Sequence, residues 1–386
     1  MTGPDDRSRK ILMWCELFWP HMGGIEHLAL EILRSLNGRG FTFEVITALE
    51  DASLPAEDDL EGIPVHRLPF RTALREHDPE RIIGCRRRIE EIRSSFEPDL
   101  IHLNGLYPGC FFHLMTRQTA PAPTLVTLHQ EMPDGPSSGP DSLFHRVIDS
   151  ADWITACSES ILAQILALRP DLETRSSTIR NAVAEPAREP APLPLAPPRL
   201  LCVGRLAPQK GFDVALRALA GLTGRLPGLE LIVAGEGSER TALEEQAGEL
   251  GIIDRVEFTG RVESDRIPDL MNRATLVVMP SRWEGLPLVA IQAAWMGRPV
   301  VATDVGGMPE IVIPGRTGCF VPVEDSVSLA GAIAELLGDP DRVRRYGRAA
   351  REHAADEFSL EHHLEQYREL YRRLTAGRSE TGPGPA

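Results

Sequence analysis

Lys210 and Glu284 have side chains of opposite charge, and each follows an apolar run typical of a buried strand. Lys210 lies in VGRLAPQKG after residues 200–203, and Glu284 opens EGLPLVAIQ after residues 276–279. In open α/β sheets, ligands bind beyond the carboxyl ends of the strands, which makes each of these residues a candidate for a ligand site. A lysine there suits a phosphate group, and a carboxylate can accept hydrogen bonds from hydroxyls. Free backbone N–H groups at the start of the helix expected after Glu284 also suit phosphate, and hydroxyls beside phosphate indicate a ligand such as a nucleotide sugar.

Lysine is rare in this chain, since it occurs only at positions 10 and 210 among 41 basic residues. It is a compact point charge on a flexible stem, whereas arginine is a rigid fork. The position of Lys210 therefore has two interpretations. It reflects chance, or Arg205 and Lys210 together hold a diphosphate beside the start of the next helix, where free backbone N–H groups favour anions.

Four segments carry a family resemblance: PHMGGIE (20–26), VGRLAPQKG (203–211), FTGRV (258–262) and EGLPLVAIQ (284–292). Their order resembles that of the retaining glycosyltransferases of family 4, over roughly residues 11–374. The resemblance implies the α/β fold called GT-B. This fold has two Rossmann-like doubly wound lobes facing across a deep cleft, with a C-terminal helix crossing back to the first lobe. The family's last segment has a glutamate at each end, but here the second position holds Gln292.

The resemblance also implies roles for individual residues. His129 is expected beside the transferred sugar, where it positions rather than abstracts a proton, and Arg205, Lys210 and Glu284 complete the catalytic set. The donor diphosphate and sugar are expected to contact Gly23, Gly24, Arg205, Lys210, Glu284, Gly285, Leu286 and Leu288. The ribose and base are expected near Gly235, Arg261, Val262, Val289 and Gln292. His21 and Glu131 are candidates on the acceptor side.

The implied reaction moves a hexose-type sugar from a nucleotide-diphosphate sugar to a hydroxyl acceptor with retention of configuration. Fixed positive groups would stabilise the leaving diphosphate, so we expect neither a metal nor another cofactor. The one DxD match, Asp339–Asp341, lies in an expected turn and is interpreted as structural. The alternative hypothesis is a non-catalytic sugar-nucleotide-binding protein of the same fold, and Gln292 is the feature that favours it.

Composition excludes some partners. The formal charge of −15 argues against nucleic acid. The six cysteines form no CxxC pair and are interpreted as reduced core residues of a cytoplasmic protein. The polar segment MTGPDDRSRK lacks the apolar stretch of a signal peptide. Peripheral attachment to the inner membrane face is left open. The arginines of an expected helix (81, 86, 87, 88 and 93) alternate with glutamates, which favours a solvated, ion-paired face.

Alternating strand and helix patterns predict two parallel sheets. In the first half, expected strands are 11–17, 43–48, 100–103, 124–128 and 153–156, with a helix at 25–36. His102 and Asn104 are expected to face the same cleft as His129, with no role assigned. In the second half, expected strands are 200–203, 229–234, 256–259, 276–279 and 300–302. The expected limits are a first lobe at 1–182, a Pro-rich linker at 183–198, a second lobe at 199–358, a returning helix at 359–376 and a disordered tail at 377–386.

Overall fold

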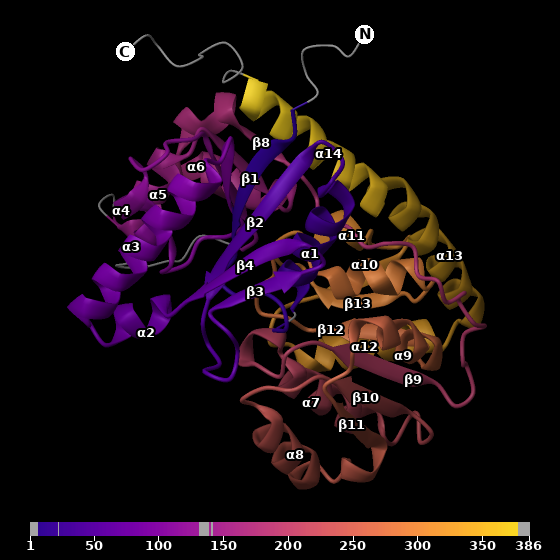
Figure 1. Cartoon of the computed structure of the whole chain (residues 1–386). Coiled ribbons are helices and arrows are strands. Elements are labelled where there is room, and N and C mark those ends of the chain that lie inside the picture. The colour runs from indigo at the N-terminus through magenta and orange to yellow at the C-terminus, as the bar shows by residue number, and fades with distance from the viewer. Residues whose placement is uncertain (1–6, 22, 131–138, 140–141, 377–386) are drawn as a thin grey trace, which may run out of the picture. The chain divides into compact units, whose positions relative to one another are not determined.

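The computed structural model describes residues 7–21, 23–130, 139 and 142–376. They form two compact α/β units (Figure 1). The first unit holds the chain up to Arg180 and the segment from His362 onwards, and the second runs from Asn181 to Glu361. The expected tail and Glu131 lie outside the described residues. The expected limits of the lobes and linker stay predictions.

In the described part of the first unit, eight strands form one sheet in the order β3-β4-β2-β1-β5-β6-β7-β8. All neighbours pair in parallel except β3 and β4, which form an antiparallel hairpin. The strands are β1 (Arg9–Trp14), β2 (Phe41–Ala48), β3 (Glu57–Leu60), β4 (Ile63–Leu68), β5 (Leu100–Leu103), β6 (Thr124–Leu128), β7 (Trp153–Ala156) and β8 (Ser176–Thr178). The central strands are short apolar runs because helices cover both faces.

Alternate side chains of β1 show this two-sided burial. Ile11 and Met13 pack in one core with Leu33 of α1, whereas Trp14 stacks on Phe70 of α2 at 5.7 Å between ring centroids. The helices of this unit are α1 (Gly24–Leu36), α2 (Phe70–Arg75), α3 (Pro79–Phe96), α4 (Cys110–Thr116), α5 (Leu143–Ser150) and α6 (Glu159–Leu168), followed by most of α14 (Leu360–Thr375).

Helix α14 is held to the first sheet by buried tyrosines. Tyr371 belongs to the same core as Phe41, and its hydroxyl lies 2.7 Å from Nδ1 of His102. Nε2 of His102 lies 2.8 Å from the hydroxyl of Thr127. His102 is fully buried, so the expectation that it faces a ligand cleft is wrong. Its strand, β5, lies in the middle of the sheet, and α14 covers the face from which this side chain projects.

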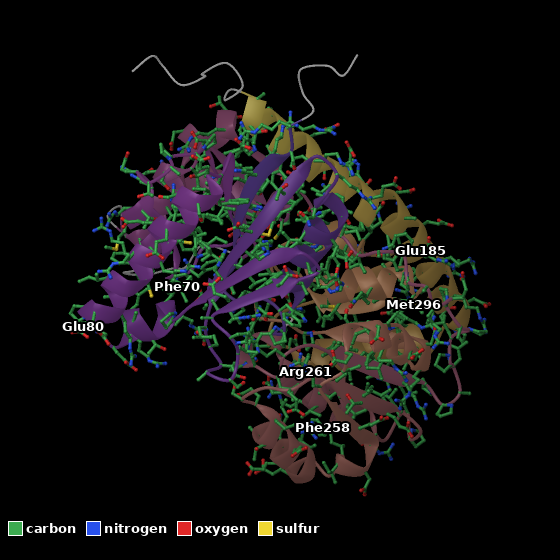
Figure 2. The ribbon with its side chains drawn as sticks, viewed as in Figure 1. Phe70, Glu80, Glu185, Phe258, Arg261 and Met296 are labelled. Atoms are coloured by element: carbon green, nitrogen blue, oxygen red, sulfur yellow. The ribbon has the colours of Figure 1, made fainter. Side chains whose placement is uncertain are left out.

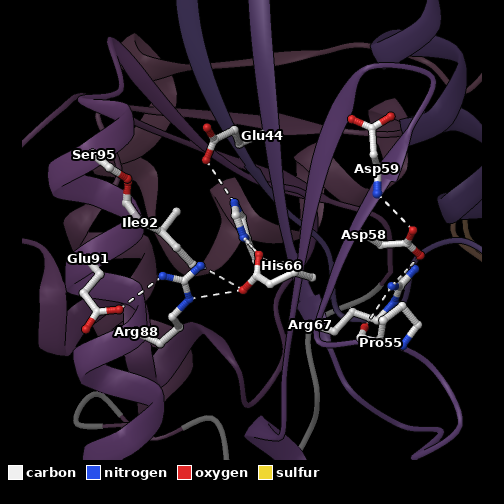
Figure 3. A network of polar contacts seen from close by, with 11 residues as sticks. Glu44, Pro55, Asp58, Asp59, His66, Arg67, Arg88, Glu91, Ile92 and Ser95 are labelled. Atoms are coloured by element: carbon white, nitrogen blue, oxygen red, sulfur yellow. Dashed lines mark hydrogen bonds and ion pairs between the residues drawn. The ribbon is translucent and has the colours of Figure 1, made fainter.

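The edge of the first sheet carries a polar network that sequence patterns did not predict (Figure 3). His66 of β4 lies between two carboxylates, with Nε2 3.0 Å from Glu44 and Nδ1 2.5 Å from Glu57. Arg88 of α3 also binds Glu57, at 2.8 Å. Both ring nitrogens face acceptors, and only a protonated imidazole donates from both. Burial lowers the pKa of His66, but the two carboxylates outweigh it and the net pKa is raised.

The expected arginine-rich helix exists as α3, and two of its arginines pair with glutamates of the same helix. Arg86 pairs with Glu90 at 2.9 Å, and Arg88 with Glu91 at 3.1 Å. Arg93 is the exception, because it is 1% exposed and donates to the carbonyl oxygens of Thr119 and Arg117. Its placement on the solvated face is therefore wrong: a guanidinium can be buried where backbone carbonyls satisfy it.

In the second unit, six described strands form a fully parallel sheet in the order β11-β10-β9-β12-β13-β14. They are β9 (Arg199–Val203), β10 (Glu230–Ala234), β11 (Val256–Gly260), β12 (Leu276–Met279), β13 (Val300–Thr303) and β14 (Gly318–Val321). The helices are α7 (Phe212–Leu222), α8 (Arg240–Glu249), α9 (Ile267–Arg273), α10 (Leu288–Trp295), α11 (Met308–Ile311), α12 (Ser326–Leu337) and α13 (Pro340–Glu357). Numbered from β9, the order is 3-2-1-4-5-6, as in dinucleotide-binding sheets.

Candidate functional site

The strand order of the second unit locates a candidate ligand site. Strands β10 and β11 extend the sheet to one side of β9 and β12 to β14 extend it to the other, so the strand order switches between β9 and β12, which pair through Leu200–Leu276 and Leu201–Val277. In open α/β sheets, ligands bind beyond the carboxyl ends of the two strands at such a switch point. Lys210 lies on the loop after β9 and Glu284 on the loop after β12. The topology therefore brings these two loops together.

Lys210 and Glu284 make a direct ion pair at this edge. Nζ of Lys210 lies 2.7 Å from Oε1 of Glu284, and the two side chains are 20% and 5% exposed. The hydroxyl of Ser281 donates to the same Oε1 atom at 2.7 Å. Within the described residues, the other oxygen, Oε2, has no hydrogen bond. The carboxylate is thus anchored through one oxygen and keeps acceptor capacity on the other.

The loop that carries Glu284 is braced from the neighbouring strand. The backbone N–H of Gly307 donates to the carbonyl oxygen of Gly285 at 2.7 Å, and the hydroxyl of Thr303 donates to the carbonyl of Ser281 at 2.5 Å. Gly306 has a positive φ of 52°, and a Cβ atom there would lie 1.8 Å from the carbonyl oxygen of Glu284. Position 306 therefore needs glycine for both conformation and space.

The loop that carries Lys210 is tied to the Glu284 loop through its backbone. The N–H of Arg282 donates to the carbonyl of Gln209 at 2.8 Å, and the side-chain amide of Gln209 donates to the carbonyl of Trp283 at 3.1 Å. Lys210 ends a 3-10 turn (Pro208–Lys210) directly before α7. The ion pair therefore joins two mutually fixed segments rather than two free loops.

Other predicted donor-side residues surround these loops. Arg205 is exposed and has no ion pair with any described residue. The N–H groups of Gly285 and Leu286 donate no hydrogen bond within the described chain, as an anion site requires. Leu288 and Val289 begin α10, and Gln292 lies one turn further, with an amide that has no described partner.

Helix α10 begins at Leu288, two residues inside the apolar run Leu286–Met296 whose periodicity predicts it. Pro287 is the N-cap residue, and a residue before proline is pushed out of the helical region. Gly235 follows β10, and a Cβ atom there would lie 1.8 Å from the carbonyl oxygen of Gly204. Arg261 and Val262 follow β11, where Arg261 is exposed and lies 3.7 Å from Glu263 (Figure 2).

The predicted residues of the first unit also lie at the carboxyl ends of its strands. Nε2 of His129 lies 2.9 Å from Oδ1 of Asn104, an acceptor, so Nε2 carries the proton. Burial, followed by the charge of His363, lowers the pKa of His129 to about 3. The ring is therefore neutral at pH 7, and its buried Nδ1 is an acceptor with no partner among the described residues. Such a histidine can orient a hydroxyl but is poorly suited to proton abstraction.

Gly23 and His21 lie on the loop after β1. The N–H of Gly23, the N-cap residue of α1, donates to the carboxylate of Glu26 at 2.9 Å, and Gly24 is the first residue of that helix. Nε2 of His21 is buried and has no hydrogen-bond partner in the described chain. The Gly23 N–H is thus already used, whereas His21 retains an unused polar atom.

Comparison with known proteins agrees with this architecture. Residues 22–185 match the family model described as Glycosyltransferase Family 4, and residues 184–353 match Glycosyl transferases group 1. D-inositol 3-phosphate glycosyltransferase 2 of Catenulispora acidiphila is 31% identical over 372 residues, which cover 86% of each chain. The chain belongs to glycosyltransferase family 4.

Other relatives match only in part. Glycogen synthase of Mycobacterium tuberculosis is 31% identical over 242 residues, and the match covers 62% of this chain but 58% of that protein. Among solved structures, sucrose-phosphate synthase from Thermosynechococcus elongatus has a TM-score of 0.83 at 23% identity, covering 96% of this chain and 100% of that one. Anabaena HepE in complex with UDP and glucose has a TM-score of 0.75 at 24% identity, covering 94% and 99%. These structures show the fold, GT-B, as the resemblance predicts.

Two polar residues at these sites were not predicted from the sequence. Ser281 holds Glu284, and a serine three residues before a loop carboxylate could have indicated this contact. Glu16 follows β1 beside the switch point of the first sheet, 3.5 Å from Arg71. Burial raises its pKa to about 7, with Arg71 opposing and Glu50 adding to the shift. A carboxylate two residues beyond a central strand was the available signal.

The described residues hold no cluster of His, Cys, Asp or Glu that could bind a metal ion. Asp339 of the DxD match caps α13 by accepting from the N–H of Arg342 at 2.9 Å, and Asp341 pairs with Arg344. Among the helices of the described chain, none has the length and apolar character to cross a membrane.

Proposed function

We propose that this chain is a retaining glycosyltransferase that moves a hexose-type sugar from a nucleotide-diphosphate sugar to a hydroxyl acceptor. The observation that carries the proposal is the meeting of Lys210 and Glu284 at the switch point of the second sheet. One group suits phosphate and the other suits sugar hydroxyls, and family membership supports the same pairing of roles. The second unit then binds the donor, and the first unit supplies His129 beside the transferred sugar, with His21 and Glu131 as candidates on the acceptor side.

The proposed mechanism is front-side displacement without a metal. The acceptor oxygen bonds to the anomeric carbon on the face that the diphosphate leaves, while the carbon–oxygen bond to the diphosphate breaks with its electron pair. The acceptor proton passes to a diphosphate oxygen. Arg205, Lys210 and the amides of Gly285 and Leu286 stabilise the charge that develops on the leaving group.

The remaining side chains position the donor. Glu284 accepts hydrogen bonds from sugar hydroxyls, and the neutral His129 orients the sugar by accepting a hydrogen bond from a hydroxyl at Nδ1, since Nε2 is held by Asn104. Gln292 contacts the ribose hydroxyls, with the base near Arg261 and Val262, while Gly235 and Val289 line the same region. Gly23 and Gly24 lie over the diphosphate, with Leu288 on its other side.

Calorimetric titration tests this proposal most directly. UDP, GDP, ADP and dTDP are titrated into the protein in the presence of EDTA, and selective binding of one is expected. Lys210→Ala should abolish most of that binding, and circular dichroism should show that the variant is still folded. NMR of the sugar released or transferred from the matching nucleotide sugar then reports its anomeric configuration, and an inverted product would contradict retention.

The second candidate function, a sugar-nucleotide-binding protein without transferase activity, is favoured by Gln292 alone. It predicts nucleotide binding with no turnover of any nucleotide sugar, even over long incubation with a mixture of hydroxyl acceptors. Release of nucleoside diphosphate at a rate that depends on Lys210 would exclude it.

A further inference from the structure

The two groups assigned to the donor are already in contact with each other. The lysine proposed to hold phosphate donates to the carboxylate proposed to hold the sugar, at 2.7 Å. Glu284 is 4% exposed, and a buried carboxylate is costly unless it is paired and hydrogen-bonded. The ion pair with Lys210 and the hydrogen bond from Ser281 provide that compensation in the ligand-free protein.

A diphosphate that enters this site must compete for the lysine. While Nζ donates to Glu284, the positive charge of Lys210 is largely neutralised, and the nearby carboxylate repels an incoming anion. Once Lys210 turns to the phosphate, Glu284 loses its counter-charge. The sugar hydroxyls of the donor are then the groups that can replace that contact.

Ser281 is placed to keep the carboxylate in position during this exchange. It is 1% exposed, its hydroxyl lies 2.7 Å from Oε1 of Glu284, and its own carbonyl is held by the hydroxyl of Thr303. Unlike the lysine, it is neutral and short, so a diphosphate does not compete for it. It therefore retains Glu284 in both states.

We infer that Glu284 competes with the donor diphosphate for Lys210, and that Ser281 is the positioning residue that holds Glu284 when the lysine transfers. This inference rests on the proposed function, since it needs a ligand that carries both a diphosphate and a sugar. Its consequence is that the sugar stabilises the bound state by replacing the contact that the diphosphate removes. A nucleoside diphosphate without sugar binds against the ion pair and gains nothing from the freed carboxylate.

Glu284→Gln separates the competition for Lys210 from the contact with the sugar. It removes the charge that competes with the diphosphate, and it weakens the hydrogen bonds to the sugar hydroxyls. The probes are UDP, GDP, ADP and dTDP, and the nucleotide sugar that each forms with glucose on its terminal phosphate (its glucose ester). Each probe is titrated by calorimetry. We expect the nucleoside diphosphate that binds the wild type to bind Glu284→Gln about fivefold more tightly, while its glucose ester binds more weakly. Weaker or unchanged binding of the diphosphate overturns the inference.

A matched control uses an ion pair at the opposite edge of the same sheet. Glu230 pairs with Arg199 at 2.9 Å, at the amino ends of β10 and β9. Glu230→Gln removes the same charge and is expected to change neither affinity by more than about twofold, because charges a Debye length apart are screened. An equal gain in Glu230→Gln would assign the effect to net charge and overturn the inference.

A double-mutant cycle distinguishes competition for the lysine from plain repulsion. In a Lys210→Met background there is no amine to release, so adding Glu284→Gln should no longer tighten diphosphate binding. The same fivefold gain in both backgrounds would show repulsion alone and contradict the competition. Binding in these weak variants is measured at millimolar nucleotide, with circular dichroism to confirm that each is folded.

Ser281→Ala tests the positioning role. We expect the affinity for the glucose ester to fall about tenfold relative to that for the diphosphate, because the carboxylate loses its second anchor. Ser328→Ala is the matched control, since Ser328 donates to Asp325 at 2.6 Å at the start of α12, away from the loops after β9 and β12. A fall in both affinities by the same factor would show a merely structural role and contradict the positioning role.

The outcomes for the two proposals are distinct. If no nucleotide or glucose ester binds the folded wild type, the proposed donor site itself is wrong, and this inference is overturned with it. If the wild type binds but Glu284→Gln shows no gain for the diphosphate, only the inference is overturned.

Discussion

Gly306→Ala should disable the candidate site while leaving the chain folded. The new Cβ atom would lie 1.8 Å from the carbonyl oxygen of Glu284. A comfortable contact between non-bonded heavy atoms needs about 3.5 Å, so the two segments must separate by roughly 1.5 Å or more. The segment that moves carries the carboxylate that Lys210 and Ser281 hold, and a misplacement of about 1 Å can cost 100-fold in rate.

The matched control is Gly315→Ala. Gly315 also has a positive φ, 76° against 52° for Gly306, so alanine meets a similar conformational cost of about 1–2 kcal/mol at both positions. At position 315, however, the nearest atom to the new Cβ would be the Tyr346 hydroxyl at 4.0 Å. The two variants therefore share the backbone strain and differ in the clash.

Activity is followed as release of nucleoside diphosphate from the nucleotide sugar that binds best, and stability as the thermal unfolding midpoint. We expect Gly306→Ala to lose about 100-fold in rate, and Gly315→Ala to keep nearly full activity with a lower midpoint. Equal activity in the two variants would refute the argument that Gly306 sets the position of Glu284.

Three further predictions follow from other parts of the chain. Gln292→Glu should tighten nucleoside diphosphate binding by about 1 kcal/mol, since a charged acceptor strengthens the ribose contact; unchanged or weaker calorimetric affinity would argue against that contact. Tyr371→Phe leaves a ring nitrogen of buried His102 unpaired and should cost about 1–3 kcal/mol in hydrogen-exchange protection of the first sheet. Tyr367→Phe should cost less, because its 3.3 Å partner Thr127 has other hydrogen bonds; equal costs would contradict this reasoning. Burial lowers the pKa of His102, His113 and His129 to about 3 and that of His363 to about 4. Because these folded pKa values lie below the ordinary 6.5, the unfolded chain takes up protons at a higher pH than the folded chain. The free energy of unfolding is therefore highest above pH 6.5 and decreases as the pH falls towards 4, by up to about 1.4 kcal/mol per pH unit for each residue. Glu16 and His66, whose folded pKa values are raised, act in the opposite direction, as two groups against four. Hydrogen exchange should therefore show the first unit losing protection on acidification before residues 181–361, which contain a single histidine; simultaneous loss in both units would refute this.

Much of the strand framework was predictable because apolar runs of four or five residues mark strands that are buried on both faces. The ranges for β5, β6, β7 and β12 agree with the structure to the residue. The hairpin of β3 and β4 was missed because Glu57–Leu60 is acidic, and strands β8 and β14 are short with weak patterns. Edge strands depend on pairing with a neighbour, which local composition does not record.

The candidate site was predictable in its members but not in its contacts. Lys210 and Glu284 could be identified because each follows a buried strand, and parallel strands place their carboxyl ends at one edge. Their separation by 74 positions hid the ion pair. The burial of His102 behind α14 and of Arg93 against the backbone that follows α4 was hidden for the same reason, because each partner is distant in sequence.

The sequence by itself determined the family, the alternation of strands and helices, and the residue types available for phosphate and sugar. These properties follow from local composition, spacing and motif order. Only the tertiary structure decided that Lys210 and Ser281 share one oxygen of Glu284, that Gly306 abuts its carbonyl, and that His129 is neutral. Those facts depend on distances and burial between segments far apart in the chain, and the folded backbone sets both.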